Sequence, residues 1–230
     1  MEIIQSYING QLTSGEGNRA IGNINPATGT EFGTVQFASV SDVDLAVQSA
    51  KEGFEIWAKT APEERAKVLL KAAQILRQRN DEIAKIEVED TGKPIAEAIE
   101  VDVVSGVEAI EYFAGLATKI EGRRVDFGNS YGYTRKEPLG VCVGIGAWNY
   151  PIQIACWKSA PALACGNSMI FKPSEMTPRT AVILAEVYSE AGLPDGVFNV
   201  LQGDAEVGKA LTTHKGVAKI SLTGEVGTGK

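Results

Sequence analysis

Asn149 is the first of several side chains between Gly146 and Glu175 that could take part in chemistry. It follows a short apolar run and precedes Pro151, and proline is favoured at the first position of a helix. The Asn149 amide could donate a hydrogen bond to an oxyanion that develops during a reaction. Alternatively, the Asn149 side chain could cap the helix that begins at Pro151. The position alone leaves both interpretations open.

A second polar group, Lys172, Pro173, Ser174 and Glu175, directly follows the apolar run SMIF. A lysine at the carboxyl end of a strand can reach a ribose or a phosphate. A carboxylate three residues later can accept hydrogen bonds from two ribose hydroxyls. The alternative is a turn that carries a solvated ion pair.

Tyr150 and Trp157 would share one face of a helix from 151 to 160, with Ile154 between them. Two electron-rich rings on one face could line a pocket for a cation. The alternative is that this stripe belongs to the hydrophobic core. Lys158 lies beside Trp157 on an otherwise apolar helix, so it is either exposed or a buried member of a proton relay.

The sequence GEVGTGK, from Gly224 to Lys230, fits the pattern GxxxxGK. In that pattern a loop after a strand uses backbone N–H groups to cradle phosphates. The serine or threonine that would bind magnesium would be residue 231, which lies outside the sequence. Strand and helix units also precede this turn, whereas a nucleoside triphosphatase normally begins with it. We interpret the segment as a phosphate-binding turn, with a nucleoside triphosphatase as the alternative.

The elements that must position these residues alternate between strand and helix. Apolar runs bounded by glycine predict strands at 140–148, 168–172, 196–203 and 218–224, with helices at 151–160, 177–191 and 205–213 between them. This alternation predicts a doubly wound, Rossmann-like α/β fold. Ligands bind such sheets at the carboxyl ends of the strands, which is where Asn149, Lys172 and Gly224 fall.

The first half of the chain predicts strands and turns followed by helices. Short strands are expected within 3–40, and a first helix is expected to begin with Ser41 as its N-cap. A second helix should begin with Pro62 and continue through 80–88, and a long one should run from 95 to 116. The glycine-, aromatic- and basic-rich segment 121–138 predicts an extended hairpin that leaves the main body and could form an interface.

Composition excludes several classes of protein. A net charge of −7 and a pI near 4.9 argue against nucleic-acid binding, which needs a basic surface. The most apolar window, 141–157, is interrupted by glycine, asparagine, proline and glutamine, so we expect no membrane span. The first residues do not form a secretory signal, and three cysteines without CxxC spacing favour reduced thiols in the cytoplasm. His214, the only histidine, cannot by itself form a catalytic triad or a histidine metal site.

Several long motifs, in order along the whole chain, resemble the NAD(P)-dependent aldehyde dehydrogenase superfamily. They are INPATG, DTGKP, GAWNYP, WKSAPALACGN, FKPSE, EAGLPDGVFNVLQG and KISLTG. Within that superfamily the chain is most similar to betaine aldehyde dehydrogenases and to the related trimethylaminobutyraldehyde dehydrogenases.

The resemblance implies roles for individual residues. Asn149 would stabilise the oxyanion that forms when a cysteine thiolate attacks an aldehyde, and Lys158 would act in a proton relay. Tyr150 and Trp157 would enclose a trimethylammonium group. The cofactor would be NAD in preference to NADP, because the Glu175 carboxylate would repel a 2′-phosphate. The implied cofactor-binding residues are Ile145, Gly146, Ala147, Trp148, Asn149, Lys172, Pro173, Ser174, Glu175, Gly203, Gly224, Glu225, Val226, Gly227 and Thr228.

The resemblance also implies a structural potassium ion held at Ile24, Asp90 and Met176, through carbonyls and one carboxylate. Two residues depart from the family pattern: Leu222 replaces a phenylalanine, and Glu225 replaces serine or glycine. A carboxylate at Glu225 would repel a pyrophosphate unless it turned away from it. The family's general-base and nucleophile motifs, Glu-Leu-Gly-Gly-Lys and Gly-Gln-x-Cys, do not occur in this sequence.

These observations predict the amino-terminal portion of an aldehyde dehydrogenase. Residues 1–120 and 139–230 would form an incomplete NAD-binding domain, 121–138 an oligomerisation hairpin, and the catalytic domain would be absent. The parent protein, a homodimer or homotetramer, would oxidise betaine aldehyde or a similar trimethylammonium aldehyde to its acid. The 230-residue chain alone should be inactive. The alternatives are the nucleoside triphosphatase and a non-catalytic NAD-binding or assembly module.

Overall fold

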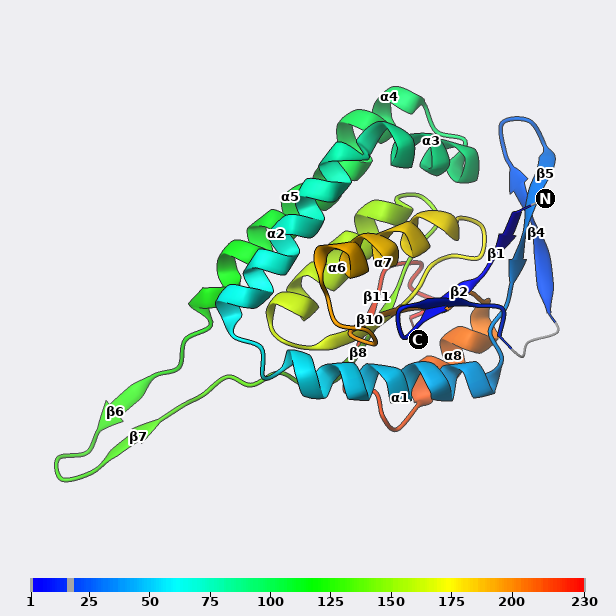
Figure 1. Ribbon diagram of the computed structural model, residues 1–230. Coiled ribbons are helices and arrows are strands. Elements are labelled where there is room, and N and C mark those ends of the chain that lie inside the picture. Colours follow the sequence, from blue (N-terminus) through cyan, green and yellow to red (C-terminus); the bar gives the residue numbers. More distant parts are fainter. Residues whose placement is uncertain (1, 16–18, 230) are drawn as a thin grey trace.

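The computed structural model describes residues 2–15 and 19–229, and a six-stranded sheet lies at its centre (Figure 1). The strand order is β11-β8-β9-β10-β2-β3. The first four of these strands are parallel: β8 (Val141–Ile145), β9 (Ser168–Lys172), β10 (Phe198–Val200) and β11 (Lys219–Leu222). β2 (Ser6–Ile8) and β3 (Gln11–Thr13) extend the sheet in antiparallel fashion beyond β10. The sheet is therefore mixed.

The chain reverses its direction of travel across the sheet at β8. It passes from β8 to β9 to β10 and then returns to place β11 on the other side of β8. In doubly wound folds such a reversal opens a crevice at the carboxyl ends of the two strands on either side of it.

Helices cover both faces of the sheet, as the doubly wound prediction requires (Figure 1). α1 (Val40–Trp57) and α8 (Ala205–Thr213) form a core with inward-facing residues such as Val143 and Ile170. α6 (Pro151–Ala164) and α7 (Arg179–Ala191) pack on the opposite face against Met169 and Phe171. Alternate residues of each central strand are buried on opposite faces, which explains its continuous apolar sequence.

A second layer of helices packs outside α6 and α7. It consists of α2 (Pro62–Gln78), α3 (Asn80–Thr91), α4 (Ile95–Glu97) and α5 (Val103–Leu116), followed by the 3-10 turn η2 (Ala117–Lys119). Pro62 begins α2 as predicted. The long helix predicted at 95–116 is interrupted by a π-helical turn, η1 (Ala98–Asp102), which buries the side chain of Asp102.

A smaller sheet and a hairpin complete the fold. β1 (Glu2–Ile4) pairs in parallel with β5 (Thr30–Gln36), and β4 (Ala20–Asn25) pairs antiparallel with β5. β6 (Arg124–Asp126) and β7 (Tyr131–Tyr133) form a two-stranded hairpin that projects far from the body (Figure 1). The hairpin itself is as predicted, whereas its role in oligomerisation stays a prediction.

Several helix ends differ from the sequence-based expectation, and α6 runs to Ala164 rather than to 160. The N-cap of α1 is Ser39 rather than Ser41, because Ser39 and Asp42 form a reciprocal capping box. α3 continues past residue 88 to Thr91 and ends where Gly92 adopts the left-handed conformation at φ 71°. α7 begins at Arg179 rather than at 177, with Pro178 at its N-cap position. Among the described residues, no helix combines the length and the apolar character needed to cross a membrane.

Candidate active site at the carboxyl ends of the parallel strands

The predicted cofactor-binding segments meet where the chain reverses across the sheet. Ile145 at the end of β8 is in register with Lys172 of β9 on one side and Leu222 of β11 on the other. Beyond the strands, the Gly146 N–H donates to the Lys172 carbonyl over 2.9 Å, and the Thr223 N–H donates to the Ile145 carbonyl over 3.1 Å. The segments 145–149, 172–175 and 224–228 therefore leave the sheet at one edge.

Lys172 is buried at this edge, with 5% of its surface exposed. Its Nζ donates to the Pro173 carbonyl over 2.7 Å and lies 3.6 Å from Oε2 of Glu175. Burial lowers the pKa of Lys172, and the Glu175 carboxylate opposes that shift. The interpretation as a solvated ion pair is thus wrong for the lysine, which is held in place by the fold, whereas its partner carboxylate reaches the surface.

Glycines allow close backbone approach at two points of the site. A Cβ atom on Gly203 would lie 2.3 Å from Cγ2 of Val207, in the first turn of α8. A Cβ atom on Gly146 would lie 2.7 Å from Cζ of Phe171. Neither position could hold a larger residue without displacing its neighbour.

The turn after β11 places the Glu225 carboxylate against its own backbone. Oε2 of Glu225 accepts a hydrogen bond from the Thr228 N–H over 3.2 Å. Glu225 therefore points into the turn rather than away from it. The same N–H also donates to the Glu225 carbonyl over 3.1 Å, so the main chain and the side chain of Glu225 share it.

Asn149 does not cap α6. The N-cap position belongs to Tyr150, whose side chain makes no capping hydrogen bond. The N–H of Ile152 instead donates over 3.2 Å to Oε1 of Glu87, a buried residue of α3. Asn149 itself is exposed at the mouth of the site, and its carbonyl accepts a hydrogen bond of 2.9 Å from Nζ of Lys93.

Glu87 belongs to a buried charged cluster behind Asn149 that the sequence analysis missed. Oε2 of Glu87 accepts a hydrogen bond from the Thr180 hydroxyl over 2.9 Å, and burial raises the pKa of Glu87 to about 8. Burial also raises the pKa of Asp102, against the hydrogen bond from Lys93. Lys93 forms a direct ion pair with Asp102. Lys93 lies in the quoted motif DTGKP, but nothing in its local sequence indicates where its side chain ends.

Tyr150 and Trp157 lie in different surroundings. Nζ of Lys93 is 4.0 Å from the centroid of the Tyr150 ring, and the Tyr150 hydroxyl donates to Oε1 of Glu97 over 3.0 Å. Trp157 is 52% exposed, so the core interpretation is wrong for this ring. A ligand cation at Tyr150 would share the ring with the Lys93 ammonium.

Trp157 and Lys158 line a cavity of about 560 Å³ on the α6 side of the sheet. Nζ of Lys158 donates to Oγ of Ser221 over 2.9 Å, and burial lowers the pKa of Lys158. A half-buried amine with a lowered pKa gains and loses a proton more readily near neutrality, as a relay requires. Tyr150 is not among the residues that line this cavity.

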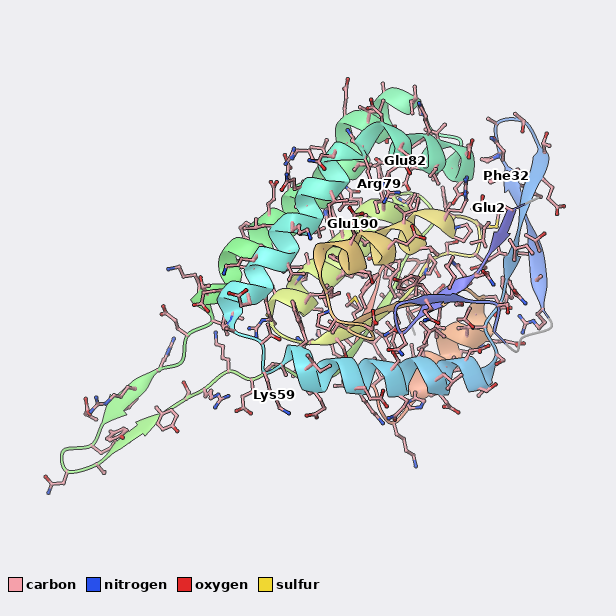
Figure 2. All side chains as sticks on the ribbon, in the orientation of Figure 1. Glu2, Phe32, Lys59, Arg79, Glu82 and Glu190 are labelled. Carbon is pink, nitrogen blue, oxygen red and sulfur yellow. The ribbon has the colours of Figure 1, made fainter. Side chains whose placement is uncertain are left out.

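Asp90, the carboxylate predicted to hold potassium, is buried and already engaged. Its Oδ1 accepts from the Asn23 amide over 3.0 Å, and its Oδ2 accepts from the Arg179 N–H over 3.1 Å. The Arg179 guanidinium lies 3.8 Å from Oδ1 and 5.1 Å from the centroid of the Phe32 ring, and it also pairs with Glu2 at 3.2 Å. Glu2 and Phe32 stand on neighbouring strands of the small sheet (Figure 2).

A potassium ion at this place would therefore have to share Asp90 with a fixed cation, and this is a physical argument against the site. The other two predicted positions, Ile24 and Met176, are exposed. Among residues 2–15 and 19–229 no cluster of three or more acidic, histidine or cysteine side chains could hold a metal ion.

None of the cysteines has the character of a nucleophile. Cys142 and Cys156 are buried, and burial raises the pKa of both thiols. Cys165 is exposed at the end of α6, away from the edge where Asn149 lies. That the reacting thiolate is none of these three cysteines stays a prediction.

Comparison with known proteins gives the family. The model of the aldehyde dehydrogenase family matches residues 12–230. An aldehyde dehydrogenase from Bacillus cereus, solved as its NAD+ complex, is 36% identical with a TM-score of 0.96, over 99% of this chain and 47% of that one. A crystal structure of a putative aldehyde dehydrogenase from Burkholderia cenocepacia is 34% identical with a TM-score of 0.96, over 98% of this chain and 47% of that one.

A 3,6-anhydro-L-galactose dehydrogenase, solved in complex with NAP, is 31% identical with a TM-score of 0.95, over 99% of this chain and 48% of that one. The chain thus spans about half the length of the solved structures that it resembles. Its family match covers the switch point of the sheet, the turn at Gly224 and the segment that contains Asn149. The chain belongs to the aldehyde dehydrogenase family.

Proposed function

We propose that this chain is the NAD-binding part of an enzyme that oxidises an aldehyde to a carboxylic acid. The observation that carries this proposal is the meeting of the segments 145–149, 172–175 and 224–228 at one edge of the sheet. The family match over residues 12–230 supports a dehydrogenase over a nucleoside triphosphatase.

The described residues fit a dinucleotide. Lys172 and Glu175 would hold the ribose of the adenosine half, with the ammonium fixed by its bond to Pro173 and the carboxylate reaching the surface. Gly203 and the turn at Gly224 would let the backbone approach the adenine and the pyrophosphate. When bound, NAD supplies the acceptor for a hydride. A 2′-phosphate would meet the Glu175 carboxylate, so we propose NAD in preference to NADP.

Asn149 and Lys158 are the residues of this chain that we place near the reaction. The exposed Asn149 amide would donate to the oxyanion of the attacked aldehyde. Lys158, half-buried and bonded to Ser221, would relay a proton. The nucleophile and the general base would come from outside these residues, and the chain alone should not turn over an aldehyde.

The substrate that we propose is betaine aldehyde or a similar trimethylammonium aldehyde, with Tyr150 and Trp157 as the cation-binding rings. Support for this choice is the exposure of Trp157 beside a cavity. The occupied face of Tyr150 limits how the two rings could cooperate. We also propose a cytoplasmic homodimer or homotetramer in which the hairpin at 121–138 contacts another subunit, with the domain division predicted from the sequence.

The test is to follow NADH formation by the complete gene product that contains this chain, with betaine aldehyde, an uncharged aliphatic aldehyde of similar size, and no aldehyde. We expect NAD reduction with both aldehydes and a lower KM for betaine aldehyde. NAD and NADP binding are measured by calorimetry on the same sample. Absence of NAD binding would refute the cofactor site. NAD binding without aldehyde oxidation would instead favour the non-catalytic module.

A further inference from the structure

The charged cluster of Glu87, Asp102 and Lys93 extends from the protein interior to Asn149 in the candidate active site. Lys93 follows the Gly92 end of α3, and its side chain is 10% exposed. Its ammonium reaches the carbonyl oxygen of Asn149 over 2.9 Å and stands 4.0 Å from the centroid of the Tyr150 ring. The Lys93 ammonium thus contacts the backbone of Asn149 and the ring of Tyr150, two of the proposed site residues.

Buried carboxyl groups hold this amine from the side of the protein interior. Lys93 pairs with Asp102, whose side chain is fully buried because the π-turn η1 directs it into the protein. Glu87 of α3 stands near Asp102, and its own partners are the Ile152 N–H in α6 and the Thr180 hydroxyl in α7. The two carboxyl groups behind the ammonium are thus held by η1, α3, α6 and α7.

The buried charges balance if Glu87 is protonated. Burial raises the pKa of Glu87 to about 8, so near neutrality it carries a proton that it can donate. Oδ1 of Asp102 is buried and has no hydrogen-bond partner among the described residues. A proton on Glu87 would satisfy that oxygen and leave one carboxylate, Asp102, facing one ammonium, Lys93.

Resting on the proposed function, we infer that Lys93 is a positioning residue for the oxyanion donor Asn149. The Asn149 peptide lies in an irregular segment between β8 and α6. Asn149 is exposed, and its side chain does not cap α6. The hydrogen bond from Lys93 fixes the carbonyl of that peptide, and the contact with Tyr150 fixes the residue after it. The amide side chain of Asn149 can then point at a developing oxyanion without first being ordered.

The test is a double-mutant cycle in the complete gene product, with betaine aldehyde and NAD as substrates. Removal of one oxyanion donor typically costs about 100- to 1000-fold in kcat, so Asn149→Ala should fall in that range. Displacement of a catalytic group by about 1 Å can cost on the order of 100-fold, so Lys93→Met should lower kcat by roughly 10- to 100-fold, with KM for NAD changed by less than about threefold. Lys93→Met should have almost no further effect in the Asn149→Ala background.

Lys85→Met is the matched control, because Lys85 is an exposed lysine of α3, the helix that ends just before Lys93. It should leave kcat unchanged in both backgrounds. Additive losses for Lys93→Met and Asn149→Ala, or a wild-type rate for Lys93→Met, would overturn the inference. If Lys93→Met does not fold, the cycle is run with Lys93→Arg, which keeps a cation beside Asp102; a smaller loss of kcat that again vanishes with Asn149→Ala is expected.

A second readout does not depend on activity. In a crystal structure of Lys93→Met, or of Lys93→Arg, we expect the Asn149 peptide to be rotated or spread over several conformations while α6 keeps its position. An unchanged, well-ordered Asn149 would refute the positioning role. If the complete protein oxidised no aldehyde, the proposed function would fail, and this structural measurement would still decide whether Lys93 orders Asn149.

Discussion

Glu225 bends back onto Thr228, so that Oε2 of the carboxylate accepts a hydrogen bond of 3.2 Å from the Thr228 N–H. The contact lies in the turn that follows β11, where a bound pyrophosphate is expected. A side-chain carboxylate and a phosphate compete for the same N–H groups, and they also repel each other. The turn of this protein therefore holds an internal competitor for the cofactor.

Glu225→Ser should tighten NAD binding, because it removes a negative charge from the turn where we place the pyrophosphate. The Thr228 N–H keeps its hydrogen bond of 3.1 Å to the backbone carbonyl of residue 225. We expect the Kd for NAD in the complete gene product to fall by about 3- to 10-fold, which corresponds to roughly 0.7 to 1.4 kcal/mol. Calorimetric titration measures the change, with the exposed and distant Glu121→Ser as the control. Weaker or unchanged NAD binding by Glu225→Ser would contradict the competition.

Glu175→Gln should relax the choice between NAD and NADP. The carboxylate lies 3.6 Å from the buried Lys172 ammonium and is partly exposed, so it would meet the 2′-hydroxyl or a 2′-phosphate directly. We expect the Kd for NAD to rise and the preference for NAD over NADP to shrink by about 10-fold. Titration of both cofactors against Glu175→Gln and the surface variant Glu190→Gln is the measurement. A preference equal to that of the wild type would show that Glu175 does not read the ribose.

Stability should fall as the pH rises from about 5 to about 8, because of Glu87. Burial raises the pKa of this group from 4.5 to about 8, so between those values the folded protein holds a proton that the unfolded chain has lost. The free energy of unfolding is then largest below pH 4.5 for this group and decreases until the pH passes 8. Burial raises the pKa of Asp90 to about 6, so Asp90 also lowers the free energy of unfolding as the pH rises, but only up to about pH 6.

Glu87→Gln should flatten the pH dependence of the free energy of unfolding between about pH 6 and pH 8, because it removes the titrating carboxyl. The neutral amide can still accept a hydrogen bond from the Ile152 N–H. Urea unfolding at several pH values measures the slope, and Glu100→Gln, which changes an exposed carboxylate on η1, should keep the wild-type slope. An unchanged slope in Glu87→Gln would mean that Glu87 is ionised in the folded protein.

Gly203→Ala should destabilise the fold beside the proposed adenine site. The new Cβ would lie 2.3 Å from Cγ2 of Val207, and overpacking of this kind typically costs about 1 to 3 kcal/mol. The combined variant Gly203→Ala with Val207→Ala should recover part of the loss in thermal unfolding. Gly115→Ala is the contrasting control, because no heavy atom stands within 4 Å of the new Cβ and alanine favours the α5 helix. Equal melting temperatures for Gly203→Ala and the wild type would contradict the packing argument.

The sequence predicted the parts of this structure that depend on local chemistry. Apolar runs between glycines located β8 and β9, and proline at the first helical position located the starts of α2 and α6. The alternation of strands and helices placed Asn149, Lys172 and Gly224 at one edge of the sheet. Ser41 failed as an N-cap because α1 already begins at Val40, where Ser39 and Asp42 form the capping box. Ser41 and Asp44 have the same three-residue spacing, so the sequence alone does not separate the two candidates.

The buried cluster could not be predicted in the same way. Glu87 caps α6 although it is 65 positions from Ile152 in the sequence, and only the packing of α3 on the central body brings them together. The π-turn that buries Asp102 adds one residue to a helical turn, and the regular helical pattern around it hides this. The occupied ring of Tyr150 also depends on where the Lys93 side chain ends.

The position of β11 has a consequence for how this sheet can be completed. Within the described residues β11 pairs only with β8, so one whole side of the strand keeps its N–H and C=O groups free of a ladder. An open strand edge of this kind is a template onto which another extended segment can pair. Ile220, at the middle of that strand, is 42% exposed, so a pairing segment would also cover apolar surface there. Lys158 and Ser221 thus lie beside β11, the end strand of the parallel part of the sheet, where a further strand can pair.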